Sequence, residues 1–565
     1  MDEKTPPTSD APTEAPQAKP SQHLTGIKLY SIMSAIMIAV FLISLDVSII
    51  STAIPAITSA FHATGDLGWY AAAYPLTMCS LQPLAGKVSA IFPMRAAYLS
   101  FFSIFLLGSL LCGVANSSTM FIAARAIAGI GGSGVVSGGL SVIAIVTPNE
   151  QRPLFTGLIV SVFSIGTVIA PIIGGAFTSH ATWRWCFLIN LPTGAITIIV
   201  LLLFFHPPKA STSTSSDDKS TPQPQSLLQK LNSLDLPGCA IFVPSIVMVF
   251  LALQWGGSKH AWSSATIIGL FVGFGLSICA FIAWELYRGE TAMIPFKLLK
   301  GRSIVLSICF AFLVIGGYIV PVYYLPEWFQ IVRGASPMRS GVMLLPAVLT
   351  QVFAAMVSGV LAKHIRYYNP WFLLGSTLVC TANGLYTTFT PSTPTSSTPD
   401  SHWIGFQILQ GLGTGCAGQM GLLTVQNELK DRPAIIPVGI ATVLFAQYFG
   451  TSVIQTIAGT VFHNKLVDGL EGKAGLNGTG VAVLLEAGTL KVRETVEDLW
   501  PERVGDVVGA YNEAITTVFY VAVAACALAF VLATGIKWNS IAMPKEAKKD
   551  TEHGDADKAI SSGDD

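Results

Sequence analysis

Residues 29–57 read LYSIMSAIMIAVFLISLDVSIISTAIPAI, an apolar run in which Asp46 is the single charged residue. A helix needs about 20 mostly apolar residues to cross a bilayer, so this run is long enough. No A-x-A cleavage site accompanies it, and we interpret it as a retained first membrane helix and not as a signal peptide. A carboxylate in such a helix is costly, which makes Asp46 the first candidate functional residue.

The composition of the whole chain extends this interpretation. Of 565 residues, 52% are apolar and only 11% are charged, whereas a soluble domain carries about 25% charged residues. We therefore expect the lipid bilayer to surround most of the chain. The formal net charge is zero, so no basic excess indicates nucleic acid. The nine cysteines show no metal-ligand or secreted-disulfide spacing, and we expect no metal site.

Apolar segments long enough to span a bilayer recur along the chain. The positive-inside rule places both termini in the cytoplasm, because 22 Lys and Arg residues then lie on the inner side and nine on the outer side, five of those nine in one long loop. An even number of spans fits this orientation. The fourteen predicted spans are centred near residues 42, 75, 105, 132, 166, 195, 246, 275, 314, 351, 380, 415, 446 and 523.

The spans and the low-complexity stretches between them divide the chain into six predicted parts. The predicted parts are a disordered cytoplasmic tail (1–27), a six-helix bundle (28–206), a cytoplasmic linker (207–236), two extra membrane helices (237–302), a second six-helix bundle with a long outer loop at 463–511 (303–538), and a second disordered cytoplasmic tail (539–565).

The two six-helix regions share glycine patterns at a nearly constant offset. RAIAGIGGSG at 125–134 matches QILQGLGTG at 407–415, and Gly166-Thr167 matches Gly450-Thr451. A same-orientation repeat of six helices is typical of transporters built from two bundles, with the substrate cavity between them. Arg125 has Gln407 as its counterpart, so the deep charge belongs to the first half only.

Several motifs resemble those of a known family. The chain is similar to fourteen-span drug:proton antiporters of the major facilitator superfamily found in fungi, over about residues 30–538. The resemblance implies an all-α fold of two six-helix bundles plus two extra helices. It rests on LDVSIISTAIP (45–55), RAIAGIGGSG (125–134), GTVIAPIIGG (166–175, with Ala170 where glycine is usual), WRWCFLINLP (183–192), YYLP (323–326), Phe329-Gln330 and Ser340-Gly341.

One motif departs from the family pattern. The segment after the second helix reads GKVSAIFPMR (86–95), with Ala90 where the family usually has an acid and no glycine near Pro93, where the family usually has one. The family's acid helps to latch the cytoplasmic side, so the latch here must be weaker or built otherwise, with Lys87 and Arg95 available. Fungal toxin exporters share this degenerate segment.

Asp46 and Arg125 are the two charges deepest in predicted spans. A carboxylate at a helix centre costs roughly 2.5 to 3.5 kcal/mol on insertion scales. Asp46 is therefore either a proton site or a packing hydrogen bond. The guanidinium of Arg125 cannot deprotonate; it either responds to a neighbouring carboxylate or binds backbone carbonyls. The resemblance implies a role in proton coupling for Arg125.

Other residues are expected to serve packing or conformational change. Gly166, Ala170 and Gly174 share one helix face and permit close helix contact, while Pro171 adds a bend. By resemblance, this motif disfavours leakage. The remaining conformational candidates are Gly86, Gly129 and Gly175.

Uncharged polar residues in the spans are candidates for the substrate cavity, although each is equally expected as a bond between helices. The chosen candidates are Gln82, Gln351, Gln407 and Gln447. Glu285 and Glu327 lie near span ends, where a solvated carboxylate costs little. Asn477 begins an Asn-Gly-Thr glycosylation acceptor in the predicted outer loop, and its use stays open.

These features favour a secondary active exporter over other classes. The histidines are scattered and no phosphate-binding loop is present, so we expect neither an enzyme nor ATP as the energy source. A non-transporting sensor is disfavoured by short tails. We predict proton-coupled export, without a cofactor, of small, largely apolar organic compounds such as toxins, secondary metabolites or drugs. The alternatives are siderophore uptake and vacuolar transport of basic amino acids. We expect a monomer in the plasma membrane, or else in the vacuolar membrane.

Overall fold

The computed structural model describes residues 26–63, 66–148, 151–205, 227–257, 259–391 and 401–538. The two predicted tails, except for residues 26 and 27, and residues 207–226 of the predicted linker lie outside the described residues. All named elements in the described ranges are helices, together with one isolated bridge between Gly256 and His260.

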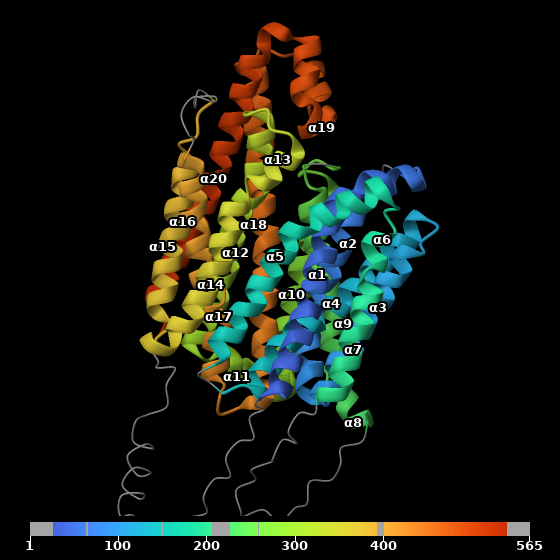
Figure 1. The fold of residues 1–565 in the computed structure, drawn as a ribbon, viewed down its shortest axis with the longest axis vertical. Helices are drawn as coiled ribbons and strands as arrows, with labels where there is room; N and C mark the ends of the chain where they lie inside the picture. The colour runs from blue at the N-terminus through green and yellow to red at the C-terminus, as the bar shows by residue number, and fades with distance from the viewer. Residues whose placement is uncertain are drawn as a thin grey trace, which may run out of the picture.

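The first half forms the helical group coloured blue to green in Figure 1. One of its helices, α4, begins at a side-chain cap, because the Ser117 side chain accepts a hydrogen bond from the Met120 N–H. Pro171 lies inside α5 without ending it. The elements are α1 (Ile27–Phe61), α2 (Leu67–Ile91), α3 (Met94–Gly113), α4 (Ser118–Val146), α5 (Arg152–His180), α6 (Trp185–Leu188) and α7 (Asn190–Phe204).

A helical hairpin lies between the two halves. Its long helices, α9 and α10, pack on each other, and α9 also contacts α2 and α18. The apolar face of α10 is largely uncovered by protein. The elements are α8 (Leu227–Asn232), α9 (Leu236–Trp255), α10 (Ala265–Arg288), η2 (Gly289–Thr291) and α11 (Phe296–Leu299).

The second half forms the yellow to red group (Figure 1). Its elements are α12 (Arg302–Ile331), α13 (Pro337–Val342), α14 (Leu345–Ile365), α15 (Asn369–Tyr386), α16 (Ser401–Ala417), α17 (Met420–Glu428), η3 (Pro433–Ile435), α18 (Ile436–Gly472), α19 (Gly478–Leu499), η4 (Pro501–Arg503) and α20 (Val504–Thr534).

Eleven segments of the described chain are long and apolar enough to cross a membrane. The chain is therefore a membrane-spanning helical protein. The helices α2, α15 and α16 are not among the eleven, although they pack within the same two bundles. In Figure 1, α8 and α11 lie at one end of the molecule, which we call the inner end, and α13 and α19 lie at the other, which we call the outer end.

The predicted internal repeat is confirmed by equivalent helix contacts. In the first half α4 packs on α2 and α3, and α1 packs on α5; in the second half α16 packs on α14 and α15, and α12 packs on α18. Matched glycines occupy matched places, because a Cβ added at Gly129 would overlap the backbone of Tyr74 and one at Gly411 would overlap that of Ala347. The repeat therefore reflects two bundles of the same construction.

The segment at 463–511 differs from the predicted loop, because most of it is helical. Helix α18 continues to Gly472, α19 follows, and α20 already begins at Val504. This part projects beyond the rest of the outer end (Figure 1). The helices of this part are stabilised by an apolar cluster of their own. Each helix has an apolar face, and these faces bury side chains between α18, α19 and α20. The buried members include Leu466, Leu470, Val481, Leu484, Val492 and Val496.

Candidate proton-coupling site

Asp46 and Arg125 lie against each other in the first bundle. The Arg125 Nη1 atom is 2.5 Å from Asp46 Oδ2, and the side chains are 1% and 0% exposed. Asp46 comes from α1 and Arg125 from α4. The two charges that sequence analysis singled out separately are therefore one buried ion pair.

Neighbouring polar groups complete the surroundings of this pair. Asn190, the first residue of α7, donates from Nδ2 to Asp46 Oδ1 at 3.3 Å and to the Ser109 hydroxyl at 3.1 Å. The guanidinium lies over the ring of Tyr74, 4.7 Å from its centroid, and 5.7 Å from that of Phe187. Such ring faces attract a desolvated cation. The pair is thus held by four helices and by the short α6.

Glycines in α4 explain why Arg125 can lie so deep in the bundle. A Cβ added at Gly129 would overlap Tyr74 O and the Thr77 hydroxyl of α2, and one at Gly131 would overlap the backbone of Phe105 in α3. Helix α4 therefore approaches both neighbours at backbone distance. This close approach places the Tyr74 ring beneath the guanidinium.

The helix-five motif packs on α1 beside the same pair. A Cβ at Gly166 would lie 2.8 Å from Ser44 Cβ, and one at Gly174 would lie 2.8 Å from Ile49 Cγ1. Ala170 between them is fully buried. Gly175 differs, since an added Cβ would meet nothing within 4 Å. The small residues at 166, 170 and 174 thus position α1, and with it Asp46.

In the 86–95 segment, the two cationic side chains, Lys87 and Arg95, bind different parts of the molecule. Gly86 touches α18, where an added Cβ would lie 2.8 Å from Pro437 O. Lys87 donates to the carbonyls of Thr291 and Ala292 after α10. Arg95 donates to Leu202 O of α7 at 2.5 Å. The segment thus contacts the second half, the region after the hairpin and the end of α7.

The four candidate glutamines all bond to other helices or segments. Their role in a substrate cavity stays a prediction, and these bonds match the packing alternative. Gln82 donates to Ser133 O (3.0 Å), Gln407 to Met343 O (2.9 Å) and Gln447 to Gly418 O (3.4 Å), and Gln351 Oε1 accepts from the Tyr318 hydroxyl (2.7 Å).

The expectation of a solvated Glu285 is wrong. Its side chain is 7% exposed and accepts from the N–H groups of Met293 and Ile294. Glu327 is half-buried, and its Oε2 atom is buried without a hydrogen-bond partner among the described residues. Asn477 is exposed and caps α19 by accepting from the Gly480 N–H at 2.9 Å. Its glycosylation stays a prediction.

Sequence analysis missed two contributors to the buried pair, Asn190 and Tyr74. Asn190 had a signal, because it stands as an amide inside the apolar end of WRWCFLINLP. Tyr74 had none, since an aromatic residue in a membrane helix is ordinary. No group of three or more His, Cys, Asp or Glu residues in the described ranges could hold a metal ion.

Most of the chain is similar in sequence to known proteins. A family model described as Major Facilitator Superfamily matches residues 36–455. The chain is 43% identical to the MFS-type transporter poxA of Penicillium oxalicum, over 96% of this chain and 94% of that protein. It is 42% identical to the MFS-type transporter pigP of Monascus ruber (92% and 87% covered) and 40% identical to the efflux pump mlcE of Penicillium citrinum (95% and 94% covered).

Solved structures show the same fold at low sequence identity. The proton:xylose symporter XylE superposes with a TM-score of 0.56 at 13% identity, covering 91% of this chain and 98% of that chain. A human organic anion transporter superposes with a TM-score of 0.53 at 13% identity, covering 90% and 100%. Both likenesses concern the fold alone.

Proposed function

The chain belongs to the major facilitator superfamily, and on that premise we propose that it is a proton-coupled antiporter that exports small, largely apolar organic compounds. The observation that carries the proposal is the buried Asp46–Arg125 pair. A carboxylate removed from water stays charged only beside a compensating cation, and the permanently charged guanidinium of Arg125 supplies one. Protonation of Asp46 would release Arg125, so the pair can convert proton binding into a change of helix contacts.

The path from this pair to the second half runs through Tyr74. Its ring lies under Arg125, and its helix, α2, packs on α18 of the second half. The Tyr74 hydroxyl itself is buried without a hydrogen-bond partner among the described residues. A shift of the guanidinium would therefore change the position of Tyr74 and the contacts of α2 where the two bundles meet.

Alternating access is supported by the contacts that close the inner end. Gly86 of α2 packs on Pro437 of α18, and Gly359 of α14 packs on Pro153 of α5; an added Cβ would lie 2.8 Å and 2.7 Å from the respective proline carbonyls. The prolines are related by the repeat offset of 284 that also relates Gly166 to Gly450. Two equivalent seals therefore close the inner end in the present arrangement.

Export, and not uptake, is supported by the similarity of the chain to the efflux pump mlcE. Apolar cargo is supported by the deep charges, because Asp46 is already neutralised by Arg125 and leaves little net charge for a cationic substrate. We propose fourteen spans, with α2, α15 and α16–α17 added to the eleven apolar segments. We further propose cytoplasmic termini, as the basic residues favour, and the plasma membrane as the location.

The test uses inside-out membrane vesicles from yeast cells that express the chain. An acidic lumen should drive accumulation of Nile red, a neutral apolar dye, and of neutral aromatic polyketides. Arginine and a ferric siderophore serve as probes for the two alternative functions. Asp46→Asn should abolish the accumulation, whereas Glu290→Gln, which removes an exposed partner of Lys297, should leave it intact. Accumulation that Asp46→Asn leaves unchanged would refute the proposed proton site.

A further inference from the structure

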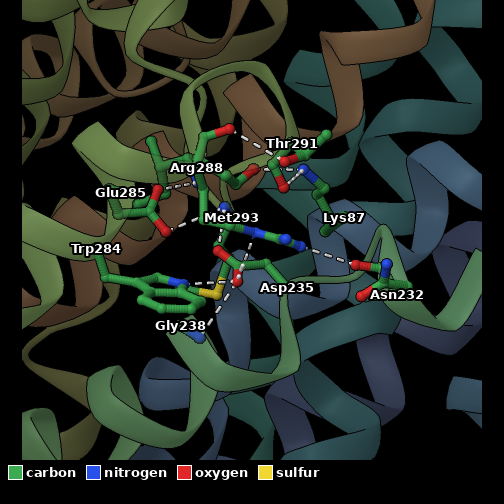
Figure 2. A network of polar contacts seen from close by, with 11 residues as sticks. Lys87, Asn232, Asp235, Gly238, Trp284, Glu285, Arg288, Thr291 and Met293 are labelled. Carbon is green, nitrogen blue, oxygen red and sulfur yellow. Dashed lines mark hydrogen bonds and ion pairs between the residues drawn. The ribbon is translucent and has the colours of Figure 1, made fainter.

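Four charged side chains gather at the inner end between α2, α9 and α10 (Figure 2). Asp235 is fully buried and caps α9, accepting from the Gly238 N–H at 3.3 Å. It also accepts from Trp284 Nε1 at 2.8 Å and from the Met293 N–H at 3.1 Å. This carboxylate therefore ties the start of α9 to the segment that follows α10.

Glu285 and Arg288, both at the end of α10, hold the same segment. Glu285 accepts from the Met293 N–H at 3.1 Å and from the Ile294 N–H at 2.8 Å. Arg288 Nε lies 3.5 Å from Asp235 Oδ1, and its Nη2 donates to Asn232 O at 2.9 Å. Two carboxylates thus fix the backbone N–H groups of residues 293 and 294.

Lys87 of α2 binds the other side of this segment. Its ammonium donates to Thr291 O at 3.1 Å and to Ala292 O, and the side chain is 7% exposed. Asp235, Glu285 and Arg288 lie around the same segment (Figure 2). The cluster therefore combines two basic and two acidic side chains, and their formal charges sum to zero.

The segment that Lys87 binds is packed on the second half. It continues into α11, where Leu298 contacts α18, since a Cβ at Gly439 would lie 3.6 Å from Leu298 Cδ1. One residue before Lys87, Gly86 already packs on Pro437 of α18. The inner end of α2 is thus held to the second half at two successive residues, by close packing and by a charged hydrogen bond.

Among the described side chains, no comparable charged hydrogen bond accompanies the equivalent seal on the other side. Gly359 packs on Pro153 in the same manner, but the residue that follows it is Val360. The hairpin inserted between the halves supplies the extra contact only at α2. Position 90 of the 86–95 segment is Ala90 and offers no side-chain partner, and Lys87 donates to the carbonyls of Thr291 and Ala292.

We propose that Lys87 is a positioning residue that fastens α2 to the segment 289–295, and that this tether must break each time the inner end opens. The two carboxylates Asp235 and Glu285 keep that segment rigid, so that its carbonyls stay in place for Lys87. The proposal rests on the alternating access of the proposed function. It does not depend on proton coupling or on the identity of the cargo.

The test measures the opening of the inner end directly. Cysteines replace Ala96 and Ala434, two exposed residues at the inner ends of the first and second halves, after the native exposed Cys279 and Cys309 are changed to serine. Spin labels on this pair report distance distributions in lipid nanodiscs, without substrate or gradient. Lys87→Met should raise the ratio of long to short distances about tenfold or more, because a charged hydrogen bond is lost. Lys87→Arg should keep the short distance.

Two further variants separate the tether from charge and from misfolding. Lys297→Met removes an exposed lysine of the same region and should leave the distances unchanged. Combining Lys87→Met with Glu285→Gln removes one basic and one acidic side chain, so the formal charges of the cluster again sum to zero. The inner end of this double variant should still open if the ammonium of Lys87 acts as a tether. A return to the short distance in this double variant would overturn the proposal, as would a Lys87→Met protein with wild-type distances. Because no gradient is applied, loss of proton-driven transport in Asp46→Asn bears on the proposed function and not on this tether.

Discussion

At the scale of residues, the proposed proton coupling depends on Asp46 and Arg125, whose side chains have no access to water in the present arrangement. Removing one member of a buried ion pair leaves the other charge without compensation, which costs about 3–5 kcal/mol. Replacing both members by apolar groups of similar size costs far less. The same pair therefore contributes to transport and to stability, and the two contributions can be separated by combining substitutions.

We predict that Asp46→Leu and Arg125→Met each lower the free energy of unfolding by about 3–5 kcal/mol, whereas the double variant recovers most of this loss. All three variants should fail to transport, because none can exchange a proton for a change in helix contacts. Thermal unfolding in nanodiscs and vesicle transport give the two measurements. A double variant as unstable as the single variants would show that the charges do not form a coupled pair.

Asn190 supports the same pair from α7. Asn190→Ala should lower the unfolding free energy by about 1.5–3 kcal/mol, since hydrogen bonds to a charged group and to Ser109 are lost together. Thr193→Val is the matched control, because the Thr193 hydroxyl donates to the Ile189 carbonyl one turn earlier and to no other described residue. Equal losses in both variants would argue against a specific role for Asn190.

At the scale of elements, glycines determine how closely the helices of the two bundles approach. The inner seals place α2 on α18 at Gly86 and α14 on α5 at Gly359. A side chain at either glycine must push the helices apart. The opposing atoms are backbone atoms at Gly359, and the Cβ of Ala441 together with backbone atoms at Gly86, and none of these atoms can rotate away. The seals are therefore steric and equivalent, while the tether at Lys87 is electrostatic and one-sided.

Gly86→Ala and Gly359→Ala should each favour an open inner end. The expected result is faster modification of a cysteine placed at Val352, in α14 facing Ser161 of α5, by a water-soluble maleimide. The control is Gly175→Ala, where an added Cβ meets nothing within 4 Å. Unchanged labelling in both seal variants would mean that the helices do not meet at these glycines in the membrane.

The outer helical segment contains the glycosylation acceptor Asn477, which also caps α19. Glycosylation of Asn477 and its role as a cap can be tested separately. Thr479→Ala removes the acceptor sequence but keeps the Asn477 cap on α19. We expect a glycan-dependent mobility difference in wild-type protein expressed in yeast, and its loss in both Thr479→Ala and Asn477→Gln. Only Asn477→Gln should also lower stability, by about 1 kcal/mol. Identical wild-type and Thr479→Ala mobility would show that no glycan is attached.

At the scale of the whole molecule, exchange of a neutral compound for a proton moves one charge across the membrane per cycle. A potential of 100 mV is worth about 2.3 kcal/mol per charge. In vesicles at a fixed pH gradient, a potassium–valinomycin potential of this size should change the equilibrium accumulation ratio about fifty-fold for one proton per cycle. An accumulation ratio indifferent to the potential would exclude one-for-one exchange with a neutral substrate.

Some of this architecture follows from the sequence alone. The scarcity of charge, the apolar runs and the glycine repeat predict a two-bundle membrane protein with an inserted hairpin, because these properties depend only on local composition and spacing. The isolation of Asp46 and Arg125 within apolar runs identifies them as functional candidates for the same reason. Local patterns do not show whether the helices that contain Asp46 and Arg125 face each other, or which atoms would meet.

Tertiary structure alone decides the partners. Asn190 and Tyr74 join the Asp46–Arg125 pair from helices distant in sequence, and the solvated Glu285 of the sequence prediction becomes buried because the chain folds back over it at Met293 and Ile294. Lys87 finds its acceptors 204 and 205 residues away. The physical reason is that a buried charge is stabilised by whatever dipoles and charges the packing of helices brings to it, and packing is a property of the assembled molecule, not of any single segment.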